Sequence, residues 1–248
     1  MVYIDFRKAF DVVPHSKLIH KLKSLGICSS TANWIEAFLT NRCQSVYINN
    51  TYSFPVAVNS GVIQGSTLGT ILFLFYINDL PQVCKNVIVK LFADDVKLYK
   101  VITSHADRVI LQLSLDALCK WADFWDLSIS IDKCVYMQIG YADELISYAV
   151  NSKTLKANAN TTDLGVIIHS SLKPSLHCAQ IAPKAHVRAK LILKCFLSCA
   201  VRLLTRAFTT HVRPLVEYYA PVWNPHHKCN IDLIASNANF HENYTTCV

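Results

Sequence analysis

The sequence predicts an α+β fold: an antiparallel sheet with helices packed on its back, followed by a mostly helical segment. Two stretches, QSVYINNTYSFPVAV and VIVKLFADDVKLYKVI, have strand-forming residues on both sides of a short polar break, which indicates hairpins. Apolar residues at helical spacing lie between and after them. Beyond Lys173 the pattern is helical, with basic residues among apolar ones. We therefore expect two domains, at 1–170 and 171–248.

The N-terminal region is expected to contain one strand, two helices and the first hairpin. MVYID alternates like a short strand, and Pro14 then opens a helix that ends at Gly26, because proline suits a first helical turn and glycine a helix end. A second helix is expected to begin near Ser29 or Ser30. The first hairpin should turn around residues 49–51. The apolar face of the second helix is formed by Trp34, Ile35, Phe38 and Leu39.

The middle of the chain should supply the core. Ser66 can cap a helix through LGTILFLFYIND, which is apolar nearly all round and is therefore expected to be buried. Two strands at 87–102 should meet at Asp94 and Asp95. A long helix is expected from Ala106 to Phe124. Strand alternation returns in three places, at 127–140 and, as a further strand pair, at 146–155 and 164–168.

Composition indicates a globular protein with a polyanionic partner. Hydrophobic residues make up 52% of the 248 and charged residues 17%, an apolar excess that predicts a further partner surface. The formal net charge of +7 favours nucleic acid. The longest apolar run, 71–77, is far shorter than the roughly 20 residues of a membrane span. The N-terminus lacks a signal-peptide apolar stretch, so we expect no membrane association and an intracellular protein, in nucleus or cytoplasm.

The ten cysteines are scattered and form no C-x-x-C pair, so reduced structural thiols are expected. Cys195 and Cys199 are four residues apart on an expected helix, and His226, His227 and Cys229 lie close together near the C-terminus, so a metal site is an alternative. The spacing of these residues leaves half of a tetrahedral ligand set missing, which disfavours such a site.

The acidic pair Asp94 and Asp95 admits two interpretations. Aspartate is common in hairpin turns for conformational reasons alone. A third carboxylate, Asp5, lies at the end of another short strand. If the two strands are neighbours, three carboxylates converge and repel one another unless cations neutralise them. Two Mg²⁺ ions would meet that need and would imply phosphoryl transfer.

A series of motifs resembles the reverse transcriptase domain of non-LTR (LINE-type, jockey-like) retrotransposons. The matching stretches are DFRKAFDVVPHSKL, SGVIQGSTLGTILFLFYINDLP, LFADDVKLY, LSISIDKCVYMQIG, DLGVIIHSSL and THVRPLVEYYAPVWNP. The resemblance implies a palm with partial fingers at 1–170, then a thumb-like helical region and C-terminal tail at 171–248. It also implies an RNA-directed DNA polymerase that uses an RNA template, a DNA primer and dNTPs.

The same resemblance implies residue roles. Asp5 and Asp94 would be the main ligands of two Mg²⁺ ions, with Mn²⁺ as an alternative, and Asp95 would support them. Phe10 would pack under the incoming sugar, although a core phenylalanine is an equal interpretation. Gln64 and Gly65 would position template and nucleotide. Lys133 would act near the leaving pyrophosphate, with a solvated surface lysine as the alternative.

The chain also departs from the family pattern. The family's fingers and endonuclease would precede Met1, so we expect a truncated nucleotide site. Ile63 and Thr70 stand where the family usually has proline, and Ser130 replaces an asparagine. The last stretch, NANFHENYTTCV, matches no known pattern. An inactive relic that at most binds nucleic acid is therefore the alternative function, and a two-metal nuclease is a third that would not need Phe10 or Gln64.

Overall fold

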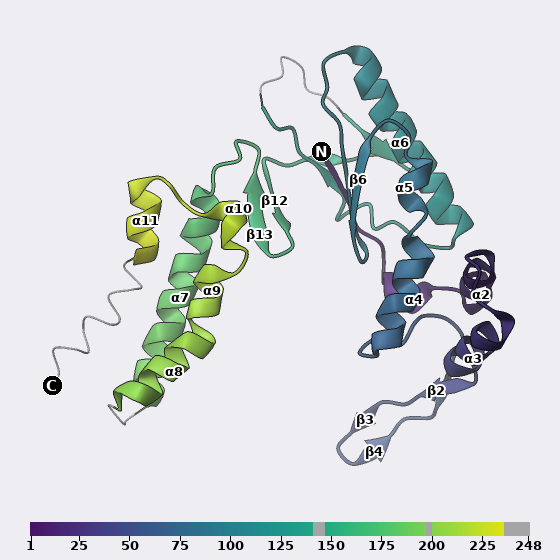
Figure 1. The fold of residues 1–248 in the computed structure, drawn as a ribbon, viewed down its shortest axis with the longest axis horizontal. Coiled ribbons are helices and arrows are strands. Elements are labelled where there is room, and N and C mark those ends of the chain that lie inside the picture. The colour runs from purple at the N-terminus through teal and green to yellow at the C-terminus, as the bar shows by residue number, and fades with distance from the viewer. Residues whose placement is uncertain (141–146, 197–199, 236–248) are drawn as a thin grey trace. The chain divides into compact units, whose positions relative to one another are not determined.

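The computed structural model describes residues 1–140, 147–196 and 200–235, and it divides the chain into two compact units (Figure 1). The first comprises Met1–Tyr136 and the described part of Ala142–Ala157. The second comprises the described parts of Met137–Tyr141 and Asn158–Val248. Both contain strands and helices, so the α+β prediction is confirmed.

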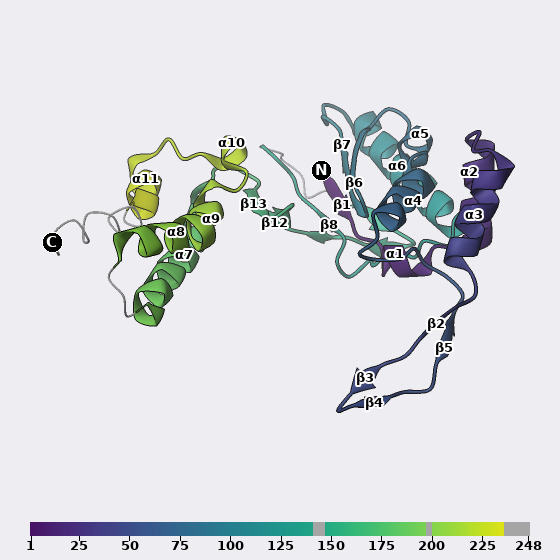
Figure 2. The same cartoon turned by 60° about the horizontal axis from the view of Figure 1, so that its bottom comes forward.

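A five-stranded sheet forms the centre of the first unit, in the order β11-β8-β1-β7-β6. Neighbouring strands are antiparallel except for the β11–β8 pair. One face buries Val2 and Ile4 of β1 and Val96 and Leu98 of β7, and Figures 1 and 2 show helices α4, α5 and α6 on one side of this sheet. The strands are β1 (Val2–Ile4), β6 (Ile88–Phe92), β7 (Asp95–Tyr99), β8 (Val135–Tyr136) and β11 (Lys156–Ala157).

The described part of the first unit contains six helices, and the caps of two of them follow the sequence. The Ser66 hydroxyl accepts a hydrogen bond from the Gly69 N–H (2.9 Å), which confirms the predicted cap. Ser104 and Asp107 cap the long helix reciprocally. The helices are α1 (Ala9–Val12), α2 (His15–Ser24), α3 (Ser29–Leu39), α4 (Thr67–Ile77), α5 (Leu80–Val83) and α6 (His105–Phe124).

Two predictions about buried faces are wrong in part. Helix α4 buries one side only, and Ile71 and Leu74 on its other side are 43% and 47% exposed. A helix that is apolar all round has no preferred face in its sequence, so its direction is decided by which neighbours exist. Trp34 of α3 is 59% exposed and stacks on Phe38, with ring centroids 6.0 Å apart. The exposed apolar side chains of α3 and α4 agree with the apolar excess of the composition.

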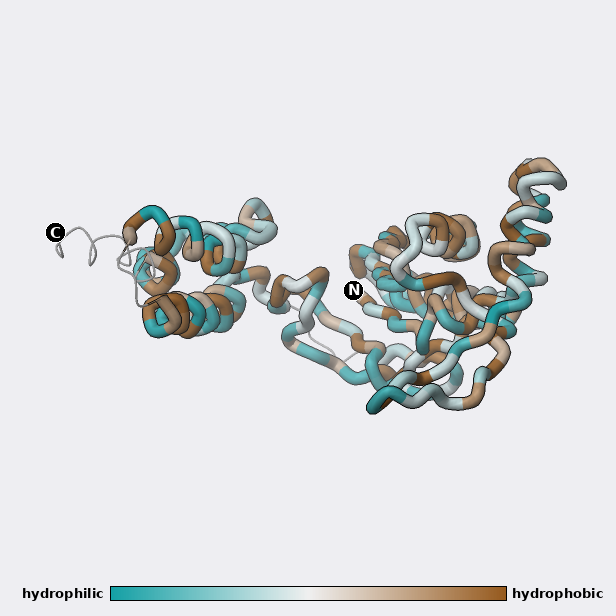
Figure 3. The backbone as a smooth tube through the Cα atoms, turned by 90° about the horizontal axis from the view of Figure 1, so that it is seen from below, coloured by the Kyte–Doolittle hydropathy of each residue, from teal (hydrophilic) through white to brown (hydrophobic). Residues whose placement is uncertain are grey.

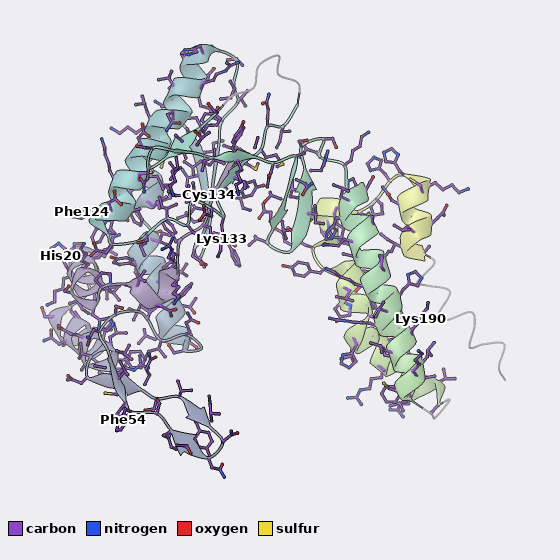
Figure 4. All side chains as sticks on the ribbon, turned by 180° about the vertical axis from the view of Figure 1, so that it is seen from behind. His20, Phe54, Phe124, Lys133, Cys134 and Lys190 are labelled. Atoms are coloured by element: carbon purple, nitrogen blue, oxygen red, sulfur yellow. The ribbon has the colours of Figure 1, made fainter. Side chains whose placement is uncertain are left out.

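The predicted hairpin at 49–51 is confirmed and forms a long ribbon. Asn49 and Asn50 both have positive φ (49° and 61°), as a two-residue hairpin turn requires. The ribbon extends away from the rest of its unit (Figure 2), and Phe54 on it is 93% exposed (Figure 4). The strands are β2 (Arg42–Gln44), β3 (Tyr47–Ile48), β4 (Thr51–Tyr52) and β5 (Val56–Val58), paired as β2–β5 and β3–β4.

The strand predictions downstream of residue 127 are wrong in detail. Within 127–140, regular strand is limited to β8, with one isolated bridge between Phe6 and Ile129. The segments at 147–155 and 164–168 do not pair with each other, because left-handed turns fold each into a local hairpin, and Ile146 lies outside the described residues. The strands are β9 (Ala149–Val150), β10 (Lys153–Thr154), β12 (Asn160–Asp163) and β13 (Val166–His169).

The second unit packs the β12–β13 hairpin on helices, as Val166 clusters with Cys178, Ile181 and Trp223. This unit therefore begins before the composition change near residue 170. The predicted helical pattern is confirmed, and Figure 3 shows apolar and polar residues alternating along these helices near the C-terminal end. The helices are α7 (Ser175–Cys195), α8 (Val201–His211), α9 (Arg213–Glu217), α10 (Ala220–Trp223) and α11 (Lys228–Ala235).

Candidate active site

The strand register brings the three predicted aspartates to one end of the sheet. Strand β1 runs antiparallel to β7, with Ile4 opposite Val96. Asp5 directly follows Ile4 and Asp95 directly precedes Val96, so their backbones lie at the same end of adjacent strands. Asp94 is one residue further on, in the turn between β6 and β7. The condition set by the sequence, that the two strands be neighbours, is met.

The turn that carries Asp94 has a strained backbone. Phe92 pairs with Asp95, so the two turn residues are Ala93 and Asp94 rather than the acidic pair itself. Ala93 has φ of 52°, a left-handed conformation that is uncommon for a residue with a Cβ. The turn after Asp5 contains a second such residue, Lys8, with φ of 49°. Strained backbone of this kind is common at functional sites, where surrounding structure maintains it.

The Asp5 carboxylate is only partly satisfied. Its Oδ1 atom is buried and makes no hydrogen bond within the described part of the chain. The Lys133 ammonium lies 3.4 Å from this oxygen in an ion pair, with the lysine side chain 68% exposed. Asp94 is partly buried, and no described residue forms a hydrogen bond or an ion pair with it. At this sheet end the Asp5 Oδ1 thus has an ion pair but no hydrogen bond, and the Asp94 carboxylate has neither within the described residues.

Asp5 and Asp94 fit a divalent cation that takes only one or two ligands from the protein. Within the described residues, no three His, Cys, Asp or Glu side chains are grouped closely enough to hold a metal ion alone. The histidines near the C-terminus, His226 and His227, are therefore not part of such a group among the described residues. The alternative ligand Cys199 lies outside the described residues. Mg²⁺ commonly takes one or two carboxylates and completes its shell with water and substrate phosphates. A buried, unsatisfied Asp5 oxygen suits such an open site better than a closed ligand set.

Phe10 lies on α1, partly buried, and stacks on Phe73 of α4 with ring centroids 4.2 Å apart. Its backbone carbonyl accepts a hydrogen bond from the Val62 N–H at 2.8 Å. One ring face is therefore occupied by the core. This contact agrees with the interpretation of Phe10 as a core residue and leaves its predicted role at the sugar a prediction.

Gln64 and Gly65 lie in the loop that precedes α4, and a neighbouring acid holds this loop. The Gln64 amide Nε2 donates to Asp11 Oδ1 at 2.9 Å, between two exposed side chains. Gly65 has φ of 85°, which favours glycine, and an added Cβ would meet nothing within 4 Å. The open space beside Gly65 leaves its backbone accessible to a substrate.

Three further residues shape this loop, and residue-by-residue reasoning missed them. Gly61 has φ of 89°, and a Cβ there would lie 2.7 Å from the Asp11 carbonyl oxygen. The buried His15 ring bonds the Gly61 carbonyl at 2.8 Å through Nε2. All three, Asp11, His15 and Gly61, stand inside the motif stretches DFRKAFDVVPHSKL and SGVIQGSTLGTILFLFYINDLP. Their position in the motifs was the available signal.

A family model for reverse transcriptase (RNA-dependent DNA polymerase) matches residues 1–168. The chain belongs to this reverse transcriptase family. The match covers the whole sheet end with Asp5 and Asp94, and the resemblance inferred from the motifs is confirmed. Members of the family use divalent metal ions, in accord with the free carboxylate oxygens of this site.

The chain is also similar to individual retrotransposon proteins. It is 29% identical over 188 residues to the RNA-directed DNA polymerase from mobile element jockey of Drosophila funebris, covering 72% of this chain and 20% of that protein. It is 32% identical over 144 residues to the probable RNA-directed DNA polymerase from transposon BS of Drosophila melanogaster, covering 54% of this chain and 16% of that protein. The chain thus spans about a fifth of the length of such relatives.

Among solved structures, a telomerase from Candida albicans, in complex with a TWJ fragment of telomeric RNA, is similar with a TM-score of 0.48. The sequences are 14% identical, and the alignment covers 100% of this chain and 48% of that one. Separately, no helix among the described residues is long and apolar enough to cross a membrane.

Proposed function

We propose that this chain is the catalytic part of a retrotransposon RNA-directed DNA polymerase, which extends a DNA primer on an RNA template with dNTPs. The observation that carries the proposal is the Asp5 Oδ1, which is buried without a hydrogen bond and is paired with Lys133, at the same sheet end as the Asp94 carboxylate. Membership of the reverse transcriptase family supports it. Because the chain spans about a fifth of its relatives, the proposal concerns the reaction centre rather than the whole protein.

In this proposal Asp5 and Asp94 hold two Mg²⁺ ions, with Mn²⁺ as a substitute, and Asp95 supports them from the start of β7. When bound, such ions lower the pKa of an attacking hydroxyl and stabilise charge on the leaving oxygen. The turn between β6 and β7 holds the backbone of Asp94, while the backbone of Asp5 directly follows β1. Holding both carboxylates before substrate arrives reduces the cost of assembling the site.

The Lys133 ammonium would pair with Asp5 in the free protein and with the leaving pyrophosphate during the reaction. In the free protein its ammonium lies 3.4 Å from Asp5 Oδ1, where it balances the carboxylate. A divalent cation on Asp5 would take over that balance and free the exposed lysine. The ammonium would then face the leaving pyrophosphate, where it can donate a proton or offset the developing charge.

The loop before α4 and the α1 ring would position the substrates. Gln64, held by Asp11, and the accessible backbone at Gly65 would orient template and nucleotide. Phe10 would present its free edge to the incoming sugar and exclude a 2′-hydroxyl, since its stacking on Phe73 prevents it from moving aside.

A second candidate is nucleic-acid binding without catalysis. It is favoured by the second unit, where residues 158–235 carry nine Lys and Arg against three Asp and Glu. Binding of this kind would show steep salt dependence and little sequence preference.

Mg²⁺-dependent primer extension on an RNA template separates the two candidates. The wild-type chain is compared with Asp94→Asn, and Asp116→Asn, on the outer side of α6, is the matched control for loss of one carboxylate. The polymerase proposal expects incorporation by wild type and control and none by Asp94→Asn. Equal incorporation by all three, or none by any alongside normal RNA binding, would contradict it.

A further inference from the structure

The buried thiol of Cys134 holds the backbone of Asp5, although 129 residues separate the two. The Asp5 N–H donates to Cys134 Sγ at 3.4 Å. Cys134 is fully buried, and Figure 4 shows it next to Lys133 at the inner part of its unit. The residue that pairs with the Asp5 carboxylate, Lys133, and the residue that holds the Asp5 backbone are therefore adjacent in the chain.

The end of the β1–β8 ladder explains why a side chain is needed at this point. The β1–β8 ladder ends at the pair Tyr3–Val135, so β8 offers no main-chain acceptor to Asp5. A buried backbone N–H without an acceptor costs free energy comparable to a lost hydrogen bond. The thiol sulfur supplies the missing acceptor, directly at the residue whose carboxylate carries the proposed reaction.

A small ring of hydrogen bonds fixes both sides of the Asp5 residue. The Ser130 N–H donates to the Asp5 carbonyl at 2.8 Å. The Cys134 thiol donates to the Ser130 carbonyl at 3.3 Å and accepts from the Asp5 N–H. A thiol has both an S–H that donates and a sulfur that accepts, so Cys134 can fill both roles.

We propose that Cys134 is a positioning residue whose thiol holds the Asp5 backbone in the conformation that presents Oδ1 to a divalent cation. This inference rests on the proposed function, because it assigns a purpose to the same carboxylate. Cys134 does not touch the substrate in this account. Its effect reaches the reaction through the main chain of Asp5, much as outer partners orient the ligands of a metal.

The contrasting explanation is a thiol that only fills space in the core. Three variants distinguish the two. Cys134→Ala removes both hydrogen bonds, while Cys134→Ser keeps a donor and an acceptor in nearly the same volume. Cys84→Ala is the matched control, because Cys84 is also a buried thiol with a pKa raised to about 11 by burial, but it donates to the Ser114 carbonyl instead.

The first measurement is hydrogen exchange at the Asp5 amide, followed by NMR without metal. We expect Cys134→Ala to exchange at least roughly tenfold faster at Asp5 than Cys84→Ala, and Cys134→Ser to restore protection. Equal protection of Asp5 in Cys134→Ala and Cys84→Ala would overturn the inference, whatever the global stability of either.

The second measurement is the affinity for Mn²⁺ alone, determined by electron paramagnetic resonance on the same proteins at a temperature where all are folded. We expect Cys134→Ala to bind about tenfold more weakly than wild type, with Cys134→Ser and Cys84→Ala near wild type. Equal affinities of Cys134→Ala and Cys84→Ala would overturn the positioning role alone. A wild type with no Asp94-dependent Mn²⁺ binding would instead overturn the proposed function, and this role with it.

Discussion

The two units of the chain differ most in where they carry charge. Residues 1–157 hold fifteen Lys and Arg against thirteen Asp and Glu, whereas residues 158–235 hold nine against three. The first unit places free carboxylates at a sheet end, and the second exposes basic residues along α7 and α8. This difference in charge supports the proposal that metal chemistry and polyanion binding use separate parts of the chain, so single variants should affect one and spare the other.

The largest expected effect is a loss of nucleotide incorporation that leaves RNA binding nearly unchanged. Asp5→Asn removes the charge of the best-positioned carboxylate, and we expect incorporation to fall by roughly a thousandfold or more. RNA affinity should stay within about twofold, because the substitution removes no basic residue that could contact the nucleic-acid backbone. Single-turnover incorporation and filter binding on one preparation measure both. A parallel fall in affinity and rate would break the separation of the two units.

A second variant tests what holds the first unit together. Lys21 is buried, bonds Asp79 Oδ1 at 2.6 Å and lies 3.8 Å from the Trp125 ring centroid. Burial lowers the pKa of Lys21 and the ion pair with Asp79 opposes that shift. Lys21→Ala leaves Asp79 without its cation, and we expect a loss of about 3 kcal/mol in the free energy of unfolding.

Urea unfolding followed by tryptophan fluorescence measures this loss. Lys23→Ala, two residues along the same helix and exposed, is the control and should cost under about 0.5 kcal/mol. If the two variants were equally stable, the buried cation would have no structural role in this unit.

A third prediction concerns the second unit and should leave the reaction centre intact. Arg202 and Arg206 are exposed one turn apart on α8. Replacing both with glutamine should lower the slope of log affinity against log salt by about 2 for duplex substrates. Replacing Lys17 and Lys23 of α2 is the matched control for the loss of two charges. Equal slopes for the two double variants would refute a binding role specific to α8.

The smallest expected effect is a pH dependence confined to the second unit. His177 is buried, accepts a hydrogen bond from the Ile167 N–H at 3.2 Å and packs on Trp223. Burial, with a smaller contribution from Lys184, lowers its pKa below 6.5. The unfolded chain therefore takes up the proton first, so stability from this residue is present above pH 6.5 and declines as pH falls below it.

Thermal unfolding between pH 5 and 8 tests the direction of this pH dependence. We expect the unfolding temperature of His177→Gln to depend less on pH than that of wild type. His169, which bonds Ser171 at the surface, provides the control through His169→Gln. If the unfolding temperature of His177→Gln depended on pH as it does in wild type, another group would cause the loss of stability at low pH.

Part of the fold and site followed from short-range patterns. The Asn49–Asn50 turn, the Ser66 cap and the acidic hairpin all depend on residues within a few positions of one another, and each appears in the structure. The gathering of Asp5 with Asp94 needed one further assumption, that their strands are neighbours, and the β1–β7 pairing supplies it.

Other features depended on partners distant in sequence, which periodicity does not encode. Helix α4 is apolar on every side, so its sequence could not indicate that Ile71 and Leu74 would be exposed. The contact of Cys134 with Asp5 exists because β8 starts two residues too late to offer a main-chain acceptor to Asp5. The Asp11–Gln64 bond likewise joins helix α1 to the loop before α4, and neither segment alone indicates it.

The central claim is that Asp5 and Asp94 share a divalent cation. The most direct test is a Mn²⁺ titration, followed by electron paramagnetic resonance, of wild type, Asp5→Asn and Asp94→Asn in the absence of nucleic acid. The account predicts Mn²⁺ binding by wild type and a loss of at least roughly tenfold in affinity in each variant. Affinities that are the same in all three proteins would contradict it.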